Sequence, residues 1–279
     1  MSLEGGSLMR INRLLCLILV SIIFFTQTHV IYAQRGVSNQ RLEWYFEKKG
    51  EEKPPVTDAR YMELVHKYDS LFIGDPAKKD IYLTFDNGYE NGYTDNVLDV
   101  LKRKKVPAAF FVTGQFMKTH PHLIKRMAEE GHIVGNHSYY HPDLTQVSDA
   151  RLKNELEKVK IRYTEITGKT DMNYIRPPRG VFSERTIMLA KQEGYTHVFW
   201  SLAFLDWETN KQRGWQYSYN QIMKQIHPGS IMLLHTVSKD NADALERTIE
   251  ALQERGYTFK SLDDLQLKKS VPTPLLFKS

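Results

Sequence analysis

The most suggestive pair of side chains in the sequence is His137 and His141, which lie four residues apart in a short stretch that ends at Pro142. This spacing lets two imidazoles face one metal ion. Taken alone it is weak evidence, because a chain with ten histidines can contain such a pair by coincidence. The pair gains weight only if other reactive side chains belong to the same place.

Other polar side chains of the kinds used by hydrolases follow short apolar runs. They are Asp86, Asn87, Arg176, Asp206 and His235. Each has an ordinary structural alternative, such as an Asn-Gly turn, a rigid proline loop or a structural histidine at a strand end. Such polar signals at the ends of so many runs are hard to explain as independent accidents.

The chain alternates β-rich runs with helical patterns. Strands are predicted over residues 81–85, 108–113, 132–136, 174–176, 196–201, 230–235 and 257–260. Helices are predicted over residues 61–71, 95–105, 121–130, 149–167, 183–193 and 240–255. Most of the later helices precede a glycine that suits a left-handed end residue, namely Gly131, Gly168, Gly194 and Gly256.

Strands separated by helices imply a mostly parallel sheet, either closed as a (β/α) barrel or open and doubly wound. In a barrel, all the strand ends that carry polar residues face one cavity. In an open sheet, only the polar residues at strand ends beside the point where the strand order reverses lie close together. The distribution of polar residues therefore favours an α/β fold, a distorted (β/α) barrel of about seven parallel strands.

Five motifs in order resemble the polysaccharide deacetylase superfamily, carbohydrate esterase family 4. They are Thr84-Phe85-Asp86-Asn87-Gly88, His137 with His141, Arg176-Pro177-Pro178, Asp206-Trp207 and Leu233-Leu234-His235. The resemblance covers roughly residues 79–259. The stretches 84–92 and 214–217 look like one branch, the delta-lactam-biosynthetic N-acetylmuramic acid deacetylases of spore-cortex peptidoglycan.

The resemblance implies catalytic roles for four residues. Asp86 would be the general base that takes a proton from a metal-bound water, with its carboxylate held by Arg176. His235, oriented by Asp206, would be the general acid for the leaving amine. Many members carry an aspartate at the position of Ala203, and we take Asp206 as the residue needed beside His235.

The resemblance also implies a substrate pocket. Trp207 and Trp200 would line it, and a backbone amide near Tyr89 would help to hold the oxyanion. Arg179 would pair with the lactyl carboxylate of muramic acid, which is free only after the stem peptide has been removed. The alternative for Arg179 is an ion pair with a nearby acidic side chain.

His137 and His141 would hold a divalent metal, which we expect to be Zn²⁺. Most of the superfamily carries a second aspartate as the third ligand, where this chain has Asn87. An amide oxygen is a neutral and weaker ligand, so we expect a weakly bound or exchangeable ion, or water in that position.

The expected function is removal of the acetyl group from N-acetylmuramic acid, a step toward muramic δ-lactam. One alternative is a deacetylase of N-acetylglucosamine or chitin. Another is a catalytically silent protein that binds wall glycans, although Asp86, Arg176 and His235 together argue against it. The expected partners are peptidoglycan glycan strands, and we expect a monomer that binds no nucleic acid.

The composition is that of a globular chain, with 41% hydrophobic and 25% charged residues among 279. The net charge of +5 does not distinguish between nucleic acid, membrane surfaces and anionic wall polymers as partners. No long block of like charges is present in the sequence. We divide the chain into a tag-like extension with signal peptide (1–33), an N-terminal extension (34–78), the catalytic domain (79–265) and a tail (266–279).

Two arginines, Arg10 and Arg13, precede an apolar run from Leu14 to Phe25, the profile of a signal peptide. An uncleaved anchor is the alternative, and it would be the only contact with a membrane. The single cysteine, Cys16, lies in this run, so the mature chain would contain no disulfide. We therefore expect a secreted or membrane-anchored protein of the cell wall or spore envelope.

Overall fold

The computed structural model describes residues 36–50 and 52–270. All the elements named below belong to the compact unit that begins at residue 40. Its main sheet has the strand order β7-β5-β4-β3-β2-β8, with β9 also paired to β2, and every pairing is parallel. The strands are β2 Asp80–Asn87, β3 Ala108–Val112, β4 Ile133–Asn136, β5 Tyr174–Ile175, β7 Thr196–His197, β8 Ser230–His235 and β9 Thr258–Phe259.

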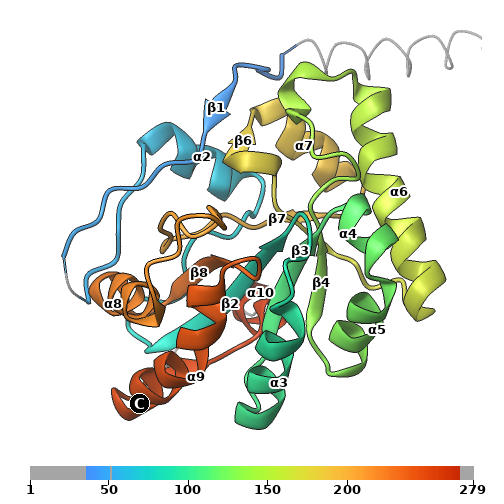
Figure 1. Cartoon of the computed structure of the whole chain (residues 1–279). Coiled ribbons are helices and arrows are strands. Elements are labelled where there is room, and N and C mark those ends of the chain that lie inside the picture. Colours follow the sequence, from blue (N-terminus) through green and yellow to red (C-terminus); the bar gives the residue numbers. More distant parts are fainter. Residues whose placement is uncertain (1–35, 51, 271–279) are drawn as a thin grey trace, which may run out of the picture. The chain divides into compact units, whose positions relative to one another are not determined.

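The sheet curls so that its two edges approach each other (Figure 1). The chain that leaves edge strand β7 reaches Leu202, which forms a parallel bridge with Met232 of the other edge strand, β8. Ser201 also donates its backbone N–H to the Ile231 carbonyl at 3.0 Å. The expected α/β fold with a distorted barrel of parallel strands is confirmed, and it takes the form of a curled half-barrel.

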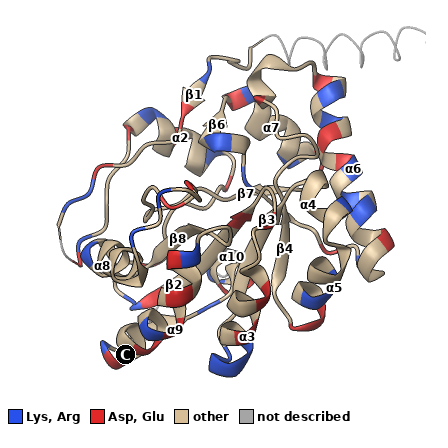
Figure 2. Ribbon diagram, in the orientation of Figure 1, with Lys and Arg blue, Asp and Glu red and all other residues tan. Residues whose placement is uncertain are grey.

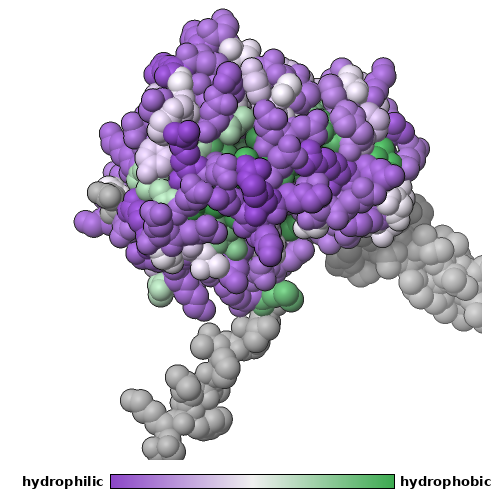
Figure 3. Space-filling view, turned by 60° about the horizontal axis from the view of Figure 1, so that its bottom comes forward, coloured by the Kyte–Doolittle hydropathy of each residue, from purple (hydrophilic) through white to green (hydrophobic). Residues whose placement is uncertain are grey.

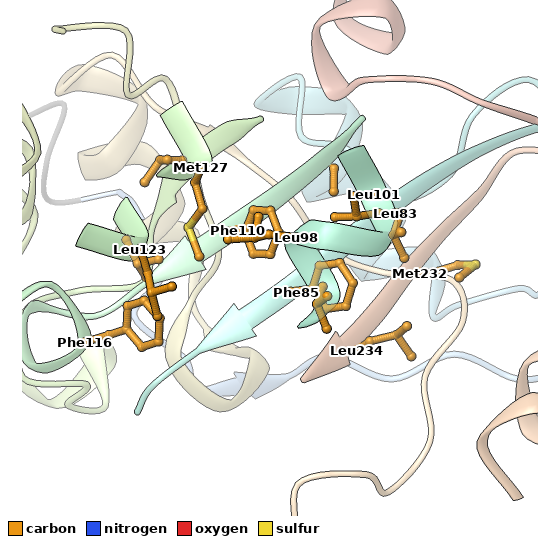
Figure 4. Packing of buried hydrophobic residues seen from close by; sticks show 14 of the residues in the cluster. Leu83, Phe85, Leu98, Leu101, Phe110, Phe116, Leu123, Met127, Met232 and Leu234 are labelled. Atoms are coloured by element: carbon orange, nitrogen blue, oxygen red, sulfur yellow. The ribbon is translucent and has the colours of Figure 1, made fainter. Parts of the chain in front are cut away.

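Both faces of the sheet are covered by apolar side chains. On the helix side Phe85 stacks on Phe110 with ring centroids 5.1 Å apart, and Leu98 packs into the same cluster (Figure 4). On the inner side Tyr82 and Phe111 belong to a second cluster. Burial on both faces explains why the predicted strands are nearly continuous apolar runs rather than alternating ones.

Helices surround the sheet and carry the charged residues outward (Figures 1 and 2). They are α2 Ala59–Lys67, α3 Thr94–Lys104, α4 Gly114–Thr119, α5 Pro121–Glu129, α6 Asp149–Thr167, α7 Glu184–Gln192, α8 Trp215–Gln225, α9 Lys239–Glu254 and α10 Leu262–Ser270. The four glycines predicted to follow helices all have positive φ, from 72° to 87°. One face of the molecule is largely hydrophilic, with hydrophobic side chains visible mainly between polar ones (Figure 3).

The segment before β2 supports the loops at one end of the sheet. Strand β1 (Leu42–Glu43) pairs antiparallel with β6 (Val181–Phe182). Next to β1, Trp44 stacks on Phe199 at 4.1 Å and donates its indole N–H to the Trp200 carbonyl at 2.9 Å. Residues of the predicted N-terminal extension therefore pack against the loop that carries Trp200.

The predicted tag-like extension with signal peptide, residues 1–33, lies outside the described residues, as do residues 271–279 of the predicted tail. Within 36–50 and 52–270, no helix combines the length and the apolar character needed to cross a bilayer.

Candidate active site

A cavity of about 820 Å³ opens where the parallel strands end. The sequence-predicted residues that line it are Asp86, Tyr89, His137, His141, Arg179, Trp200, Trp207 and His235. They come from the ends of β2, β4 and β8 and from the loops after β5 and β7. Arg176 and Asp206 lie behind this lining, each in contact with a residue that does face the cavity.

Asp86 is a buried carboxylate held from two sides. The fully buried Arg176 donates from Nη1 to Asp86 Oδ1 at 2.8 Å, and His137 Nε2 lies 3.6 Å from Oδ2. Burial alone would raise the pKa of Asp86, but the positive charges of Arg176 and the nearby histidines outweigh it and hold the pKa below its usual range. Asp86 is therefore ionised at neutral pH and can accept a proton.

His235 is fixed by Asp206, which is almost completely buried. Asp206 accepts from His235 Nδ1 at 2.7 Å and from the His235 backbone N–H at 2.9 Å, and Asn241 donates to the same carboxylate. Burial would lower the pKa of His235, but the charge and hydrogen bond of Asp206 raise it above its ordinary value. With Nδ1 occupied, Nε2 is the nitrogen free to deliver a proton to the cavity.

The loop that carries the histidine pair is held by buried polar side chains. Asn136 accepts from the Ser138 backbone N–H at 2.9 Å, and Glu155 accepts from the Tyr140 backbone N–H at 2.7 Å. Ser138 and His141 both have positive φ, 63° and 57°, a strained conformation for residues other than glycine. Such strain is concentrated at functional sites, where the surrounding structure over-determines it.

His137 and His141 have the chemistry of metal ligands. Their ring centroids lie 4.8 Å apart, and the Arg176 carbonyl occupies His137 Nδ1 at 2.8 Å, which leaves Nε2 as the nitrogen with a free lone pair. Burial lowers the pKa of His137, and it lowers that of His141 to about 4. Both imidazoles are therefore neutral at neutral pH, the form that binds a divalent ion.

The predicted third ligand, Asn87, does not line the cavity. Asp86 lines the cavity, whereas the next residue of β2, Asn87, is fully buried and donates from its amide nitrogen to Thr236 Oγ1 at 2.6 Å. Its Oδ1 has no hydrogen-bond partner in the structure. Within the described residues no group of three His, Cys, Asp or Glu side chains forms a metal cluster, so two imidazoles would need a further ligand.

The cavity walls carry aromatic and basic side chains. Trp207 is half exposed and its ring lies 5.3 Å from that of His235, and Tyr89 is also half exposed. Trp200 packs so closely that a side chain on Gly180 would collide with it at 2.7 Å. Arg179, at φ 58°, is exposed at the rim, and none of the described acidic side chains pairs with it.

Sequence reasoning missed several residues that the structure brings to the site. Tyr139 and Tyr140 lie between the two histidines and line the cavity, as do Gln115 and Lys118 of α4. Asn241, which holds Asp206, lies on α9, far along the chain. The two tyrosines were visible inside the histidine motif, but no pattern in the sequence indicated Asn241.

Together the groups suit hydrolysis of an amide. A base with a lowered pKa and an acid with a raised pKa border one cavity, and each is oriented by a buried partner of opposite charge. The base can activate water and the acid can protonate a departing amine.

Comparisons with known proteins agree with this chemistry. Residues 73–198 match the family model described as polysaccharide deacetylase. The chain is 52% identical over 241 residues to the peptidoglycan-N-acetylmuramic acid deacetylase PdaA of Bacillus subtilis, covering 86% of this chain and 92% of that protein. It is 32% identical to a peptidoglycan-N-acetylglucosamine deacetylase of Bacillus cereus, covering 72% of this chain and 73% of that protein.

The fold is also similar to those of solved family 4 carbohydrate esterases. The structure of Bacillus subtilis PdaA, a family 4 carbohydrate esterase, superimposes with a TM-score of 0.82 at 52% identity, covering 84% of this chain and all of that one. A family 4 carbohydrate esterase from Bacillus anthracis has a TM-score of 0.71 at 51% identity, covering 83% of this chain and 99% of that one.

Proposed function

The chain belongs to the polysaccharide deacetylase family, carbohydrate esterase family 4, and from this premise we propose that it removes the acetyl group from N-acetylmuramic acid in peptidoglycan. One observation carries the proposal: two pairs of oppositely charged side chains, Asp86 with Arg176 and His235 with Asp206, lie at the same cavity. The 52% identity to a muramic acid deacetylase supports the choice of sugar.

In this proposal Asp86 is the general base. Its Oδ1 is occupied by Arg176, so Oδ2 is the oxygen available to take a proton from the attacking water. Because Arg176 is rigidly buried against the rings of Phe111 and Trp200, it fixes the carboxylate in one orientation.

His235 is the general acid. The bond from its Nδ1 to Asp206 orients the ring and raises its pKa, so the protonated ring can deliver the Nε2 proton to the amine nitrogen as the carbon–nitrogen bond breaks. Trp207 lies against this ring and would exclude water from it when a sugar is bound.

His137 and His141 would hold a divalent ion, which we propose is Zn²⁺, with Asn87 as a third ligand if its unpartnered Oδ1 turns toward the ion. When bound, the metal polarises the amide carbonyl and lowers the pKa of a water. With only neutral ligands, its affinity would be lower than with an aspartate in the set.

The preference for muramic acid rests on Arg179. Its guanidinium lies at the cavity rim without an acidic partner among the described residues, so it is available to a carboxylate of the substrate. The lactyl ether of muramic acid offers such a carboxylate once the stem peptide is gone, whereas glucosamine offers none. Tyr89, Trp200 and Trp207 would pack on the sugar rings.

This substrate also sets the proposed location. A protein that acts on peptidoglycan works outside the cytoplasmic membrane, at the wall or spore envelope, which agrees with the signal peptide predicted within residues 1–33. Glycan strands are the proposed partner, and a monomer is the proposed form of the protein.

The proposal is tested by offering peptide-free glycan strands, intact peptidoglycan and chitin oligomers side by side and measuring released acetate. We expect fastest release from peptide-free strands. Arg179→Gln should remove that preference, while Arg162→Gln, on the outer surface of α6, should retain it. Faster release from chitin oligomers by the wild type contradicts the muramic acid assignment.

A further inference from the structure

The base and the acid of the proposed mechanism lie at the ends of two paired strands, β2 and β8 (Figure 1). The last residue pair in the register between these strands is Asp86 with His235. Beyond this pair, the chain that leaves β8 no longer pairs with β2. The distance between the two reactive side chains therefore depends on what joins the segments that follow them.

A buried side-chain bond extends the connection between these segments by one residue. Asn87 directly follows the base in the sequence, and Thr236 directly follows the acid. The amide nitrogen of Asn87 donates to Thr236 Oγ1 at 2.6 Å, and both residues are 0% exposed. A second bond, from Asn91 Nδ2 to the Val237 carbonyl at 3.0 Å, joins the same two segments. The neighbours of the base and the acid are thus held together by side chains.

Thr236 is also bonded on its other side. Its Oγ1 lies 2.8 Å from Oγ1 of Thr94, the first residue of α3, which is buried as well. Thr94 Oγ1 is in turn hydrogen-bonded to Glu90 Oε2. The other oxygen of that carboxylate accepts the backbone N–H groups of Gly92 at 2.6 Å and of Thr94 at 3.2 Å. Glu90 is therefore fixed at the start of α3.

Asn87, Thr236, Thr94 and Glu90 form a row of hydrogen-bonded side chains whose direction follows from their protons. A carboxylate only accepts, so the single hydroxyl proton of Thr94 is donated to Glu90. The contact between the two threonines must then use the proton of Thr236, whose oxygen still accepts from Asn87. Each hydroxyl in the row donates once and accepts once. Bonds arranged in this way strengthen one another in a buried environment.

We propose that Thr236 is a positioning residue for deacetylation, because the row that passes through it fixes the base at the end of β2 relative to the acid at the end of β8. Thr236 does not line the cavity, so it acts through its neighbours. A misplacement of about 1 Å can cost about 10²-fold in rate, so a bond outside the cavity can control turnover. The proposal rests on the base and acid roles of Asp86 and His235, and not on the choice of sugar.

The first experiment compares the wild type with Thr236→Val, which replaces the hydroxyl by a methyl group of similar size. Acetate release is measured on the glycan that the wild type deacetylates fastest, at a saturating concentration of divalent ion. We expect kcat to fall by about 10 to 10²-fold, while KM stays nearly unchanged because the cavity walls that bind the sugar are not altered. Thr236→Ser keeps the hydroxyl and should therefore retain most of the wild-type kcat.

The matched control is Thr248→Val. Thr248 lies on α9, is 1% exposed and donates to the Ala244 carbonyl at 2.9 Å, so this change removes a buried threonine hydroxyl away from the cavity. Denaturant unfolding of each variant verifies that it is folded. Only Thr236→Val should lose kcat. A normal kcat in Thr236→Val, an equal loss of kcat in Thr248→Val, or an effect confined to KM overturns the proposal.

Thr94→Val tests the row from its other end and leaves the bond between Asn87 and Thr236 in place. It also keeps the proposal testable if Thr236→Val does not fold. We expect a smaller loss of kcat than in Thr236→Val, and a double variant no slower than Thr236→Val alone, since the two hydroxyls act as one unit. A normal kcat in Thr94→Val, or losses that multiply in the double variant, overturns the proposal.

Failure of this proposal is distinct from failure of the proposed function. Faster acetate release from chitin oligomers by the wild type would contradict the muramic acid assignment. The comparison of the threonine variants would then be made on chitin oligomers, with the same expected results.

Discussion

The contact between Asp206 and His235 makes a quantitative prediction about the pH dependence of the reaction. Asp206→Asn preserves the shape of the side chain but removes its charge. A hydrogen bond to a charged group contributes about 1.5 to 3 kcal/mol, and one pKa unit corresponds to about 1.4 kcal/mol. Because Asp206 raises the pKa of His235, its loss should lower that pKa.

The acid is active only when His235 is protonated, so the alkaline limb of the kcat/KM profile should move to lower pH by the same amount. Acetate release from peptide-free strands, measured across the pH range, gives this limb. The matched control is Asp240→Asn, another buried aspartate, which accepts from the Arg213 backbone N–H away from the cavity. An alkaline limb that stays in place in Asp206→Asn, or moves equally in the control, refutes the role of Asp206.

Asp86→Asn should leave glycan binding nearly unchanged and lower kcat by about 10² to 10⁴-fold, since it removes the base; near-normal kcat contradicts the assignment. His141→Ala or a chelator should abolish activity while leaving the fold intact, and full activity in a verified metal-free sample argues against a metal site. Asn87→Asp should tighten divalent-ion binding in calorimetry because it adds a charged oxygen ligand, and an unchanged affinity would place Asn87 away from the ion. Gly114→Ala puts a Cβ 2.4 Å from the Tyr139 ring, so denaturant unfolding should show a loss of about 1 to 3 kcal/mol, and an unchanged stability would mean that the ring shifts at no cost.

The elements predicted with most success are those whose signals are local. The strand 230–235 and the helix 149–167 have the predicted bounds, and the other predicted strands start within one residue of where they form. Continuous apolar runs and flanking glycines report backbone conformation directly. The gathering of Asp86 and His235 in one cavity followed from parallel topology, which brings all the strand ends together.

What the sequence left undetermined depends on contacts between distant segments. Helix α4 has only six residues, too few for a periodic pattern, and the buried residues of α8 are mostly polar, Ser218 and Gln225 beside Ile222. That Asp86 lines the cavity while Asn87 is buried beside Thr236 depends on how β2 pairs with its neighbouring strands, which the motif itself does not contain. Likewise, the bond from Trp44 to the Trp200 loop joins segments about 150 residues apart.

The central claim is tested most directly by mass analysis of peptide-free glycan strands after incubation with the purified protein, with Asp86→Asn as the inactive control. We predict that acetyl groups are lost from muramic acid residues and retained on glucosamine residues, and that the control leaves both sugars acetylated. Loss of acetyl from glucosamine instead, or no loss from either sugar by the wild type in the presence of a divalent metal, contradicts the account.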